Sequence, residues 1–218
     1  MCARTIVIGD IHGCAQAFDA VLKAIDPTPD DRLITLGDYV DRGPDSRGVV
    51  DRLFALADQC QLVPLLGNHE RMLIQALESL EQLILWLGYG GQQTVDSYGG
   101  DPHQIPREHI RFMRGCRLYF ETQTHIFLHA NYQHDLPLDA QPEDKLLWTH
   151  LTQSMPPPHY SGKKVIVGHT PQVSGEILEV DYLACIDTCC YGGGWLTALD
   201  VDSGRQWQAN QDGQLRAG

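Results

Sequence analysis

The first third of the chain alternates short apolar runs with segments whose apolar residues recur every three or four positions. The runs are rich in β-branched residues and leucine, as buried strands are, and they span residues 5–9, 32–36 and 61–66. A helix-like segment follows each run. The third segment predicts one long helix, with one face formed by Leu73, Leu77, Leu80, Ile84 and Leu87. Strands and helices in this order predict a parallel sheet with right-handed crossovers.

The second half differs, because short strand-like runs are separated there by glycine-rich turns. We expect a hairpin around Gln123, and then strands at residues 163–167, 176–180, 182–187, 195–201 and 205–209. These later strands are expected to be mostly antiparallel. Together the two halves predict an α/β protein in which two sheets pack against each other with helices outside. The length of 218 residues suits a single domain, 1–218.

Composition and charge argue against two kinds of partner. The chain is 43% hydrophobic, but its purely apolar stretches are only a few residues long, whereas a membrane-spanning helix needs about 20. Sixteen Lys and Arg against 28 Asp and Glu give a net charge of −12, which repels nucleic acids and anionic membranes. We therefore expect neither as a partner. An anionic substrate can still bind where a metal ion reverses the local field.

Seven cysteines are an odd number without paired spacings, and the N-terminus runs into the first strand pattern without a separate signal segment. Both features favour reduced thiols and a cytoplasmic location.

Three consecutive predicted strands end in polar clusters. These are Gly9-Asp10-Ile11-His12-Gly13, Gly37-Asp38-Tyr39-Val40-Asp41-Arg42-Gly43 and Gly67-Asn68-His69-Glu70. Two later apolar runs end in His129-Ala130-Asn131 and Gly168-His169-Thr170. The carboxyl ends of parallel strands share one edge of a sheet, where such folds bind ligands. One such cluster alone is usually an ordinary turn, but five at successive strand ends indicate a functional site.

The donors in these clusters are oxygen and imidazole, without sulfur, which suits manganese, iron or zinc. Six ligands suffice for two ions if one carboxylate bridges them, and two-metal sites are a standard device for attack on phosphorus. We expect two divalent ions, with manganese favoured. The candidate ligands are Asp10, His12, Asp38, Asn68, His129 and His169.

From Gly9 to about Val201 these motifs resemble the phosphoprotein phosphatase branch of the calcineurin-like metallophosphoesterases, in particular the small bacterial and phage lambda type serine/threonine phosphatases. The resemblance implies a four-layer α/β/β/α sandwich. It also implies that one ion is held by Asp10, His12 and Asp38. Asp38 would bridge to the second ion, whose other ligands would be Asn68, His129 and His169.

The same resemblance implies the catalytic roles. Arg42 and Asn68 would bind phosphate oxygens. His69, oriented by Asp41, would protonate the leaving group after direct attack by a hydroxide that the two ions share. No step requires a covalent intermediate, so the cysteines need not take part.

Two positions depart from the family pattern. That pattern usually places an arginine two residues after a tryptophan, whereas here His150 follows Trp148. We expect His150 to contact substrate; alternatively it is an exposed loop residue, and Lys163 or Lys164 supplies the second positive charge. Where the family pattern reads Ile-Asp-Thr-Gly, this chain has Ile186-Asp187-Thr188-Cys189. The glycine-rich turn that follows, to residue 194, carries Tyr191, which is expected on the substrate wall, although a mobile turn joining two strands explains the pattern equally well.

The main expectation is a monomeric, metal-dependent phosphomonoesterase. Its substrates would be phosphoserine and phosphothreonine in proteins, with phosphotyrosine as an extension. The alternative is a hydrolase of dinucleoside polyphosphates or another phosphodiester on the same metal centre. A catalytically inactive binding module is a third possibility, disfavoured because no expected ligand is missing.

Overall fold

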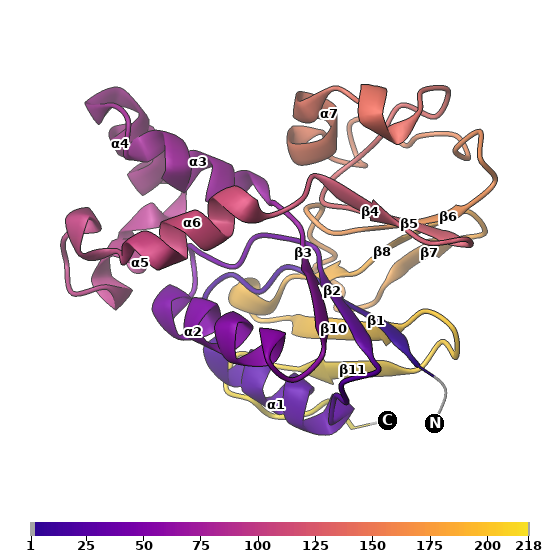
Figure 1. The fold of residues 1–218 in the computed structure, drawn as a ribbon, viewed down its shortest axis with the longest axis horizontal. Helices are drawn as coiled ribbons and strands as arrows, with labels where there is room; N and C mark the ends of the chain where they lie inside the picture. The colour runs from indigo at the N-terminus through magenta and orange to yellow at the C-terminus, as the bar shows by residue number, and fades with distance from the viewer. Residues whose placement is uncertain (1–2, 218) are drawn as a thin grey trace.

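Two mixed β-sheets pack face to face in the computed structural model, which describes residues 3–217 (Figure 1). The first sheet has the order β11-β10-β1-β2-β3, with β9 paired to β10. Its strands are β1 (Thr5–Ile8), β2 (Arg32–Thr35), β3 (Gln61–Pro64), β9 (Asp187–Thr188), β10 (Trp195–Asp200) and β11 (Gln206–Ala209). As expected, β1, β2 and β3 are parallel. Their connections contain helices α1 (Ala15–Ile25) and α2 (Ser46–Ala57).

The second sheet has the order β4-β5-β6-β8-β7. Its strands are β4 (Tyr119–Glu121), β5 (His125–Leu128), β6 (Lys164–Val167), β7 (Leu178–Val180) and β8 (Leu183–Cys185). The hairpin around Gln123 is confirmed by the antiparallel pairing of β4 and β5. The expectation of mostly antiparallel strands is wrong for the centre of this sheet, because β5, β6 and β8 run parallel. The long connection from β5 to β6 contains η3 (Leu138–Ala140) and α7 (Glu143–Trp148), so it can cross over the sheet and return in the same direction.

Alternating side chains divide the apolar core into layers. Val7 and Ile34 of the first sheet meet Phe127 and Ile166 of the second between the two sheets. Their sequence neighbours point the other way: Ile6, Ile8 and Leu33 pack in the cluster that contains the apolar faces of α1 and α2, and Ile126, Leu128 and Val165 pack in the cluster that contains Leu146 of α7. Period-two alternation thus produces two packed sheets with helices outside, as expected.

The strand predicted over residues 182–187 is two strands in two sheets. β8 pairs with β6 and β7, and β9 pairs with β10 of the first sheet. Ile186, between them, is buried in the core between the sheets. The chain therefore changes sheets at this point and places Asp187 inside the molecule.

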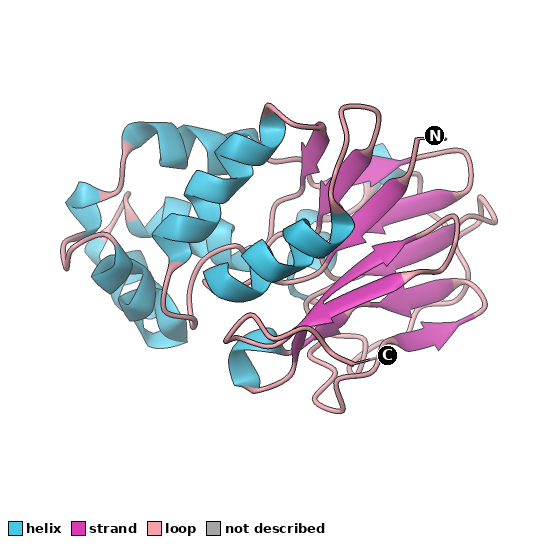
Figure 2. Cartoon of the chain, turned by 90° about the horizontal axis from the view of Figure 1, so that it is seen from below, coloured by secondary structure: helices cyan, strands magenta, loops and turns pink. Residues whose placement is uncertain are grey.

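The single long helix predicted after β3 is wrong. The segment folds as α3 (Asn68–Ala76), α4 (Leu80–Trp86), the π-helical turn η1 (Leu87–Gly91) and α5 (Gln92–Ser97), with η2 (Pro102–Gln104) and α6 (Arg107–Gly115) after them. Ser79 starts a new helix by accepting the backbone N–H of Gln82, and Gly90 has a φ of 105° that ends the regular helix. Figure 2 shows most helices to one side of the strands.

No helix within residues 3–217 is both long and apolar enough to span a membrane. The six cysteines in this range have free thiols; Cys2 lies outside the described residues.

Candidate metal centre

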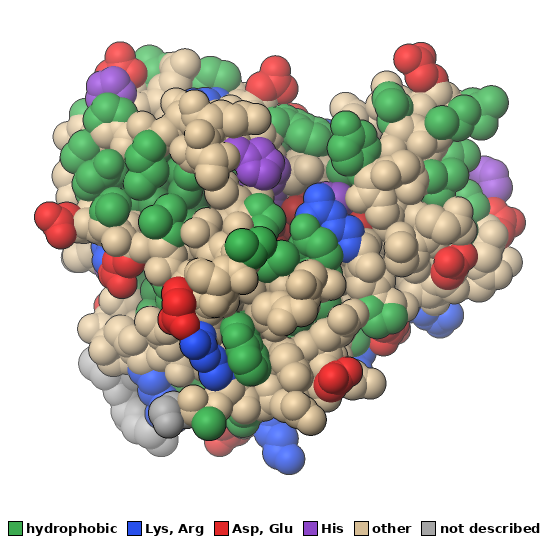
Figure 3. Space-filling model, turned by 180° about the vertical axis from the view of Figure 1, so that it is seen from behind, with side chains coloured by type: hydrophobic (Ala, Val, Ile, Leu, Met, Phe, Trp, Pro, Cys, Tyr) green, Lys and Arg blue, Asp and Glu red, His purple; other side chains and the backbone are tan. Residues whose placement is uncertain are grey.

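The strand-end clusters of the two sheets come together at one place. Asp10 and His12 follow β1, Asp38 follows β2, and Asn68 begins α3 after a short connection from β3. His129 and His169 follow β5 and β6. All six side chains are buried. Figure 3 shows a hollow on the face seen from behind, where histidine, acidic and Lys or Arg side chains lie close together.

One set of donors surrounds the Oδ1 side of Asp38. His129 Nε2 lies 3.5 Å from Asp38 Oδ1, 2.9 Å from Asn68 Oδ1 and 3.2 Å from His169 Nδ1. Asn68 Oδ1 is also 3.0 Å from His169 Nδ1. Asp38, His129 and His169 have the mutual spacing of a metal site.

A second set lies on the other side of the same carboxylate. His12 Nε2 is 3.3 Å from Asp38 Oδ2, and His69 Nε2 is 4.0 Å from it. This spacing also suits a metal ion. Asp38 thus offers one oxygen to each set, which is the arrangement that a bridging carboxylate needs.

The carboxylate of Asp10 lies next to the two donor sets, against the backbone of Gly168 and His169. Both its carboxylate oxygens accept the N–H of His169, at 3.2 and 3.0 Å. A Cβ at position 168 would lie 2.0 Å from Asp10 Oδ1, so glycine is required there. Burial, together with the nearby carboxylates of Asp187 and Asp38, raises the pKa of Asp10 well above its usual value.

The histidines present unprotonated nitrogens to the site. His12 Nδ1–H donates to the carbonyl of Val40 at 2.9 Å, and His129 Nδ1–H donates to that of Leu36 at 2.8 Å. Each bond fixes the ring proton on Nδ1, so the unprotonated Nε2 faces Asp38. Burial lowers the pKa of His12 and of His129, and lowers that of His169 to about 3. Neutral imidazoles of this kind can bind a metal ion.

The buried carboxylates of this site would be stabilised by a divalent cation. Burial alone would raise the pKa of Asp38, but the surrounding histidines hold it below its usual range. Asp187 Oδ2 is buried without a hydrogen-bond partner, and burial raises the pKa of Asp187 to about 7. Buried carboxylates that lack donors are stabilised by a cation.

The backbone around the site is held in an unusual conformation. His12, Asp38, Asp41, Arg42 and His169 all have positive φ angles between 46° and 73°. For side chains other than glycine such angles are strained, and they persist where surrounding contacts enforce them.

Glu70 supplies several of those contacts. Its buried carboxylate accepts the backbone N–H groups of Asp38, Tyr39, Val40 and Gly67 at 2.7–3.2 Å. It therefore ties the loop after β2 to the start of α3, and holds Asp38 in register with Asn68.

His69, whose Nε2 lies in the second donor set, forms a buried pair with Asp41 through its other ring nitrogen. His69 Nδ1–H donates to Asp41 Oδ2 at 2.7 Å, and His69 Nε2 is buried without a partner. Burial acts to lower the pKa of His69, but Asp38 and the bond to Asp41 outweigh it and raise that pKa. Asp41 also accepts the indole N–H of Trp86 and the hydroxyl of Thr94.

Arg42 and Tyr191 lie together at the same place. Arg42 Nη1 donates to the Tyr191 hydroxyl at 2.7 Å, and its guanidinium lies 4.7 Å from the centre of the Tyr191 ring. The Tyr191 ring is 4.8 Å from that of His12. The structure thus places both residues beside the donor sets.

His150 also lies at the site, since its ring is 4.3 Å from that of His169. Lys163 and Lys164 do not: they stand at the opposite end of β6 and pair with Glu121 and Glu179. The alternative that assigned the second positive charge to these lysines is therefore wrong.

Sequence reasoning gave no role to Glu70, Trp86, Thr94 or Asp187. Glu70 had a partial signal, because a glutamate at the third position of a helix can accept the backbone N–H of the residue that caps it, as Glu70 does from Gly67. Trp86 and Thr94 had none, because their partner Asp41 lies 45 and 53 residues away.

Comparison with known proteins agrees with this geometry. The family model described as calcineurin-like phosphoesterase matches residues 3–202. The chain is 31% identical to "Bis(5'-nucleosyl)-tetraphosphatase PrpE [asymmetrical]" of Geobacillus thermodenitrificans over 88% of each chain. It is 41% identical to "Serine/threonine-protein phosphatase 1" of Salmonella typhimurium over 58% of each.

A solved structure described as a putative diadenosine tetraphosphatase superposes with a TM-score of 0.74 at 24% identity, covering 95% of this chain and 93% of the other. The expected fold is thereby confirmed. With residues 3–202 matched, this chain belongs to the calcineurin-like phosphoesterase family.

Proposed function

We propose that this protein is a dinuclear-metal phosphohydrolase whose preferred substrates are dinucleoside polyphosphates. The observation that supports a dinuclear centre is the Asp38 carboxylate, whose two oxygens face two separate donor sets. Asp10 and His12 would hold one ion with Asp38, and the other would be held by Asp38 with Asn68, His129 and His169. Divalent ions there would neutralise phosphoryl oxygens and acidify a water molecule.

The chain's own residues supply the remaining chemistry. Arg42 would bind phosphate oxygens with its planar guanidinium, after exchanging its bond to Tyr191 for the substrate. Asn68 would orient the same phosphate. His69 would hold a proton on Nε2 for the leaving oxygen, while Asp41 keeps its ring oriented through Nδ1.

The proposed substrate preference rests on the histidine at position 150 and on the similarity of the chain to a tetraphosphatase over most of its length. An arginine there would clamp a dianionic monoester with its planar fork of donors, whereas histidine is shorter and has only two ring nitrogens. A weaker clamp favours substrates with one charge fewer on the reacting phosphate. Among the reported relatives, the one matched over 88% of both chains is named a tetraphosphatase.

A phosphoprotein phosphatase is the second candidate. It is favoured by the 41% identity to serine/threonine-protein phosphatase 1, although that match covers 58% of each chain. The same metal ligands and acid would serve both reactions, so only the substrate wall distinguishes them.

The test compares diadenosine tetraphosphate, a phosphoserine peptide and p-nitrophenyl phosphate with manganese present. We expect the highest kcat/KM for the dinucleotide and loss of all activities in Asp38→Asn. Asp58→Asn, which changes an exposed carboxylate at the end of α2, is the matched control. A higher kcat/KM for the phosphopeptide would select the second candidate. Absence of turnover on all three substrates would refute a hydrolase.

A further inference from the structure

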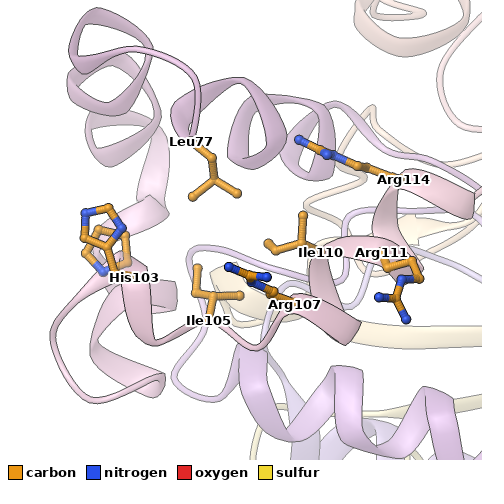
Figure 4. Close-up of a pocket in the computed structure, with 8 residues that line it drawn as sticks. Leu77, His103, Ile105, Arg107, Ile110, Arg111 and Arg114 are labelled. Atoms are coloured by element: carbon orange, nitrogen blue, oxygen red, sulfur yellow. The ribbon is translucent and has the colours of Figure 1, made fainter.

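A second hollow lies away from the metal centre, between the end of α3, η2 and α6 (Figure 4). Its volume is about 460 Å³, within the range of small-molecule sites. Leu77, at its edge, follows Asn68 by nine positions along α3, which corresponds to about 13 Å. None of the proposed metal ligands lines it.

The hollow combines an apolar floor with concentrated positive charge. Leu77, Ile105 and Ile110 project into it, and the guanidinium groups of Arg107 and Arg114 extend toward its centre (Figure 4). Arg111, on the same helix, also lines the hollow, but its guanidinium is directed away from the centre. This clustering is unusual in a chain with only 16 Lys and Arg and a net charge of −12.

The arginines are available for a ligand. Within residues 3–217, no carboxylate lies within ion-pair distance of Arg107. Arg114 has one contact, 3.8 Å from Glu78, whose side chain is 66% exposed. A pair this long and exposed contributes little and is readily exchanged for a phosphate. His103 lines the opposite wall as a further donor.

We propose that this hollow binds a nucleoside phosphate, with the base against the aliphatic floor and the phosphates on Arg107 and Arg114. Charge complementarity requires an anion, and the apolar floor requires a ring or chain attached to it. The choice of a nucleoside phosphate among such anions rests on the proposed function, whose products belong to that class. Because the hollow lies apart from the metal centre, it would sense these products rather than process them.

The test is direct binding of ADP to the full chain in the presence of EDTA, which removes metal-dependent phosphate binding at the catalytic centre. We expect saturable binding, weakened about 10-fold by Arg107→Ala and by Arg114→Ala, since each would lose one charge-assisted contact. Arg111→Ala is the matched control: it removes the same charge from the same helix and should change affinity by less than about 2-fold. Thermal unfolding verifies that all three variants fold.

The affinities of pyrophosphate and of adenosine, each measured separately, show how much the phosphates and the base contribute to binding. We expect both to bind more weakly than ADP. Equal affinities for ADP and pyrophosphate would overturn the assignment of the base to the floor. The site itself is refuted if binding is not saturable, disappears with EDTA, or is weakened as much by Arg111→Ala as by Arg114→Ala. Hydrolysis of diadenosine tetraphosphate is assayed independently, so failure of this site and failure of the proposed function remain distinguishable.

Discussion

The indole N–H of Trp86 donates to both carboxylate oxygens of Asp41, at 3.0 and 2.8 Å. Trp86 is fully buried at the end of α4, and Thr94 of α5 donates to the same carboxylate at 2.6 Å. Since Asp41 in turn orients His69, the helical segment beyond α3 is connected by hydrogen bonds to the proposed acid.

Trp86→Phe should therefore lower kcat about 10-fold for substrates with poor leaving groups, because Asp41 loses a donor that orients it. The loss should be much smaller for p-nitrophenyl phosphate, and negligible in a His69→Asn background. Trp207→Phe is the control, since the Trp207 indole N–H is buried without a partner. Equal losses on both kinds of substrate would show that Trp86 acts only through stability.

His69→Asn should reduce kcat about 10²- to 10⁴-fold for an alkyl phosphate, whose leaving oxygen needs a proton. The effect should be much weaker for p-nitrophenyl phosphate, because its leaving group departs as a stable anion. The slope of log kcat against leaving-group pKa measures this difference. An unchanged slope would remove His69 from the acid role.

Divalent metal should stabilise the wild-type protein, because a ligand that binds only the folded state raises its free energy of unfolding. Manganese at 100 times its Kd adds about 2.7 kcal/mol. Asp38→Asn should abolish most of this gain, since Asp38 faces both donor sets. Thermal unfolding with and without manganese, together with metal analysis, gives the measurement. If Asp38→Asn retained the full stabilisation by manganese, Asp38 would not be shared by two ions.

His150→Arg should raise kcat/KM for a phosphomonoester relative to a diester, because a fully charged guanidinium binds the outer oxygens of a dianion. His150→Ala should shift the ratio the other way or leave it unchanged. If wild type and both variants give the same ratio, His150 does not contact substrate despite its place beside His169.

Away from the metal centre, the ion pair between Arg4 and Asp31 should make the free energy of unfolding depend on pH. The hydrogen bond from Arg4 holds the pKa of Asp31 below its usual value, and Thr28 donates to the same carboxylate. A depressed pKa stabilises the folded state above the unfolded value of about 3.9, and the gain is lost as pH falls through the folded value.

Asp31→Asn should therefore lower the free energy of unfolding by about 2 kcal/mol at pH 7. Its difference from wild type should shrink below about pH 4. Chemical denaturation from pH 3 to 7 measures this, with Asp58→Asn as the control. A difference independent of pH would show that charge on Asp31 is not the cause.

Local chemistry in the sequence determined where strands end and which candidate ligands follow them. Asp10, Asp38 and Asn68 could be placed at one sheet edge because parallel strands must align their carboxyl ends. Periodicity likewise predicted the two sheets, since it reports which face of each element is buried. These properties depend on residues only a few positions apart.

Tertiary structure alone decided the rest, because the decisive contacts join distant segments. The apolar stripe from Leu73 to Leu87 suits one helix, yet the Ser79 cap and the turn at Gly90 break it, and Leu80 and Ile84 remain exposed. This break places Trp86 over Asp41. The sheet change at Ile186 likewise buries Asp187 beside Asp10. Periodicity measures amphipathicity, but it contains no information about which distant partner a face or a buried donor will meet.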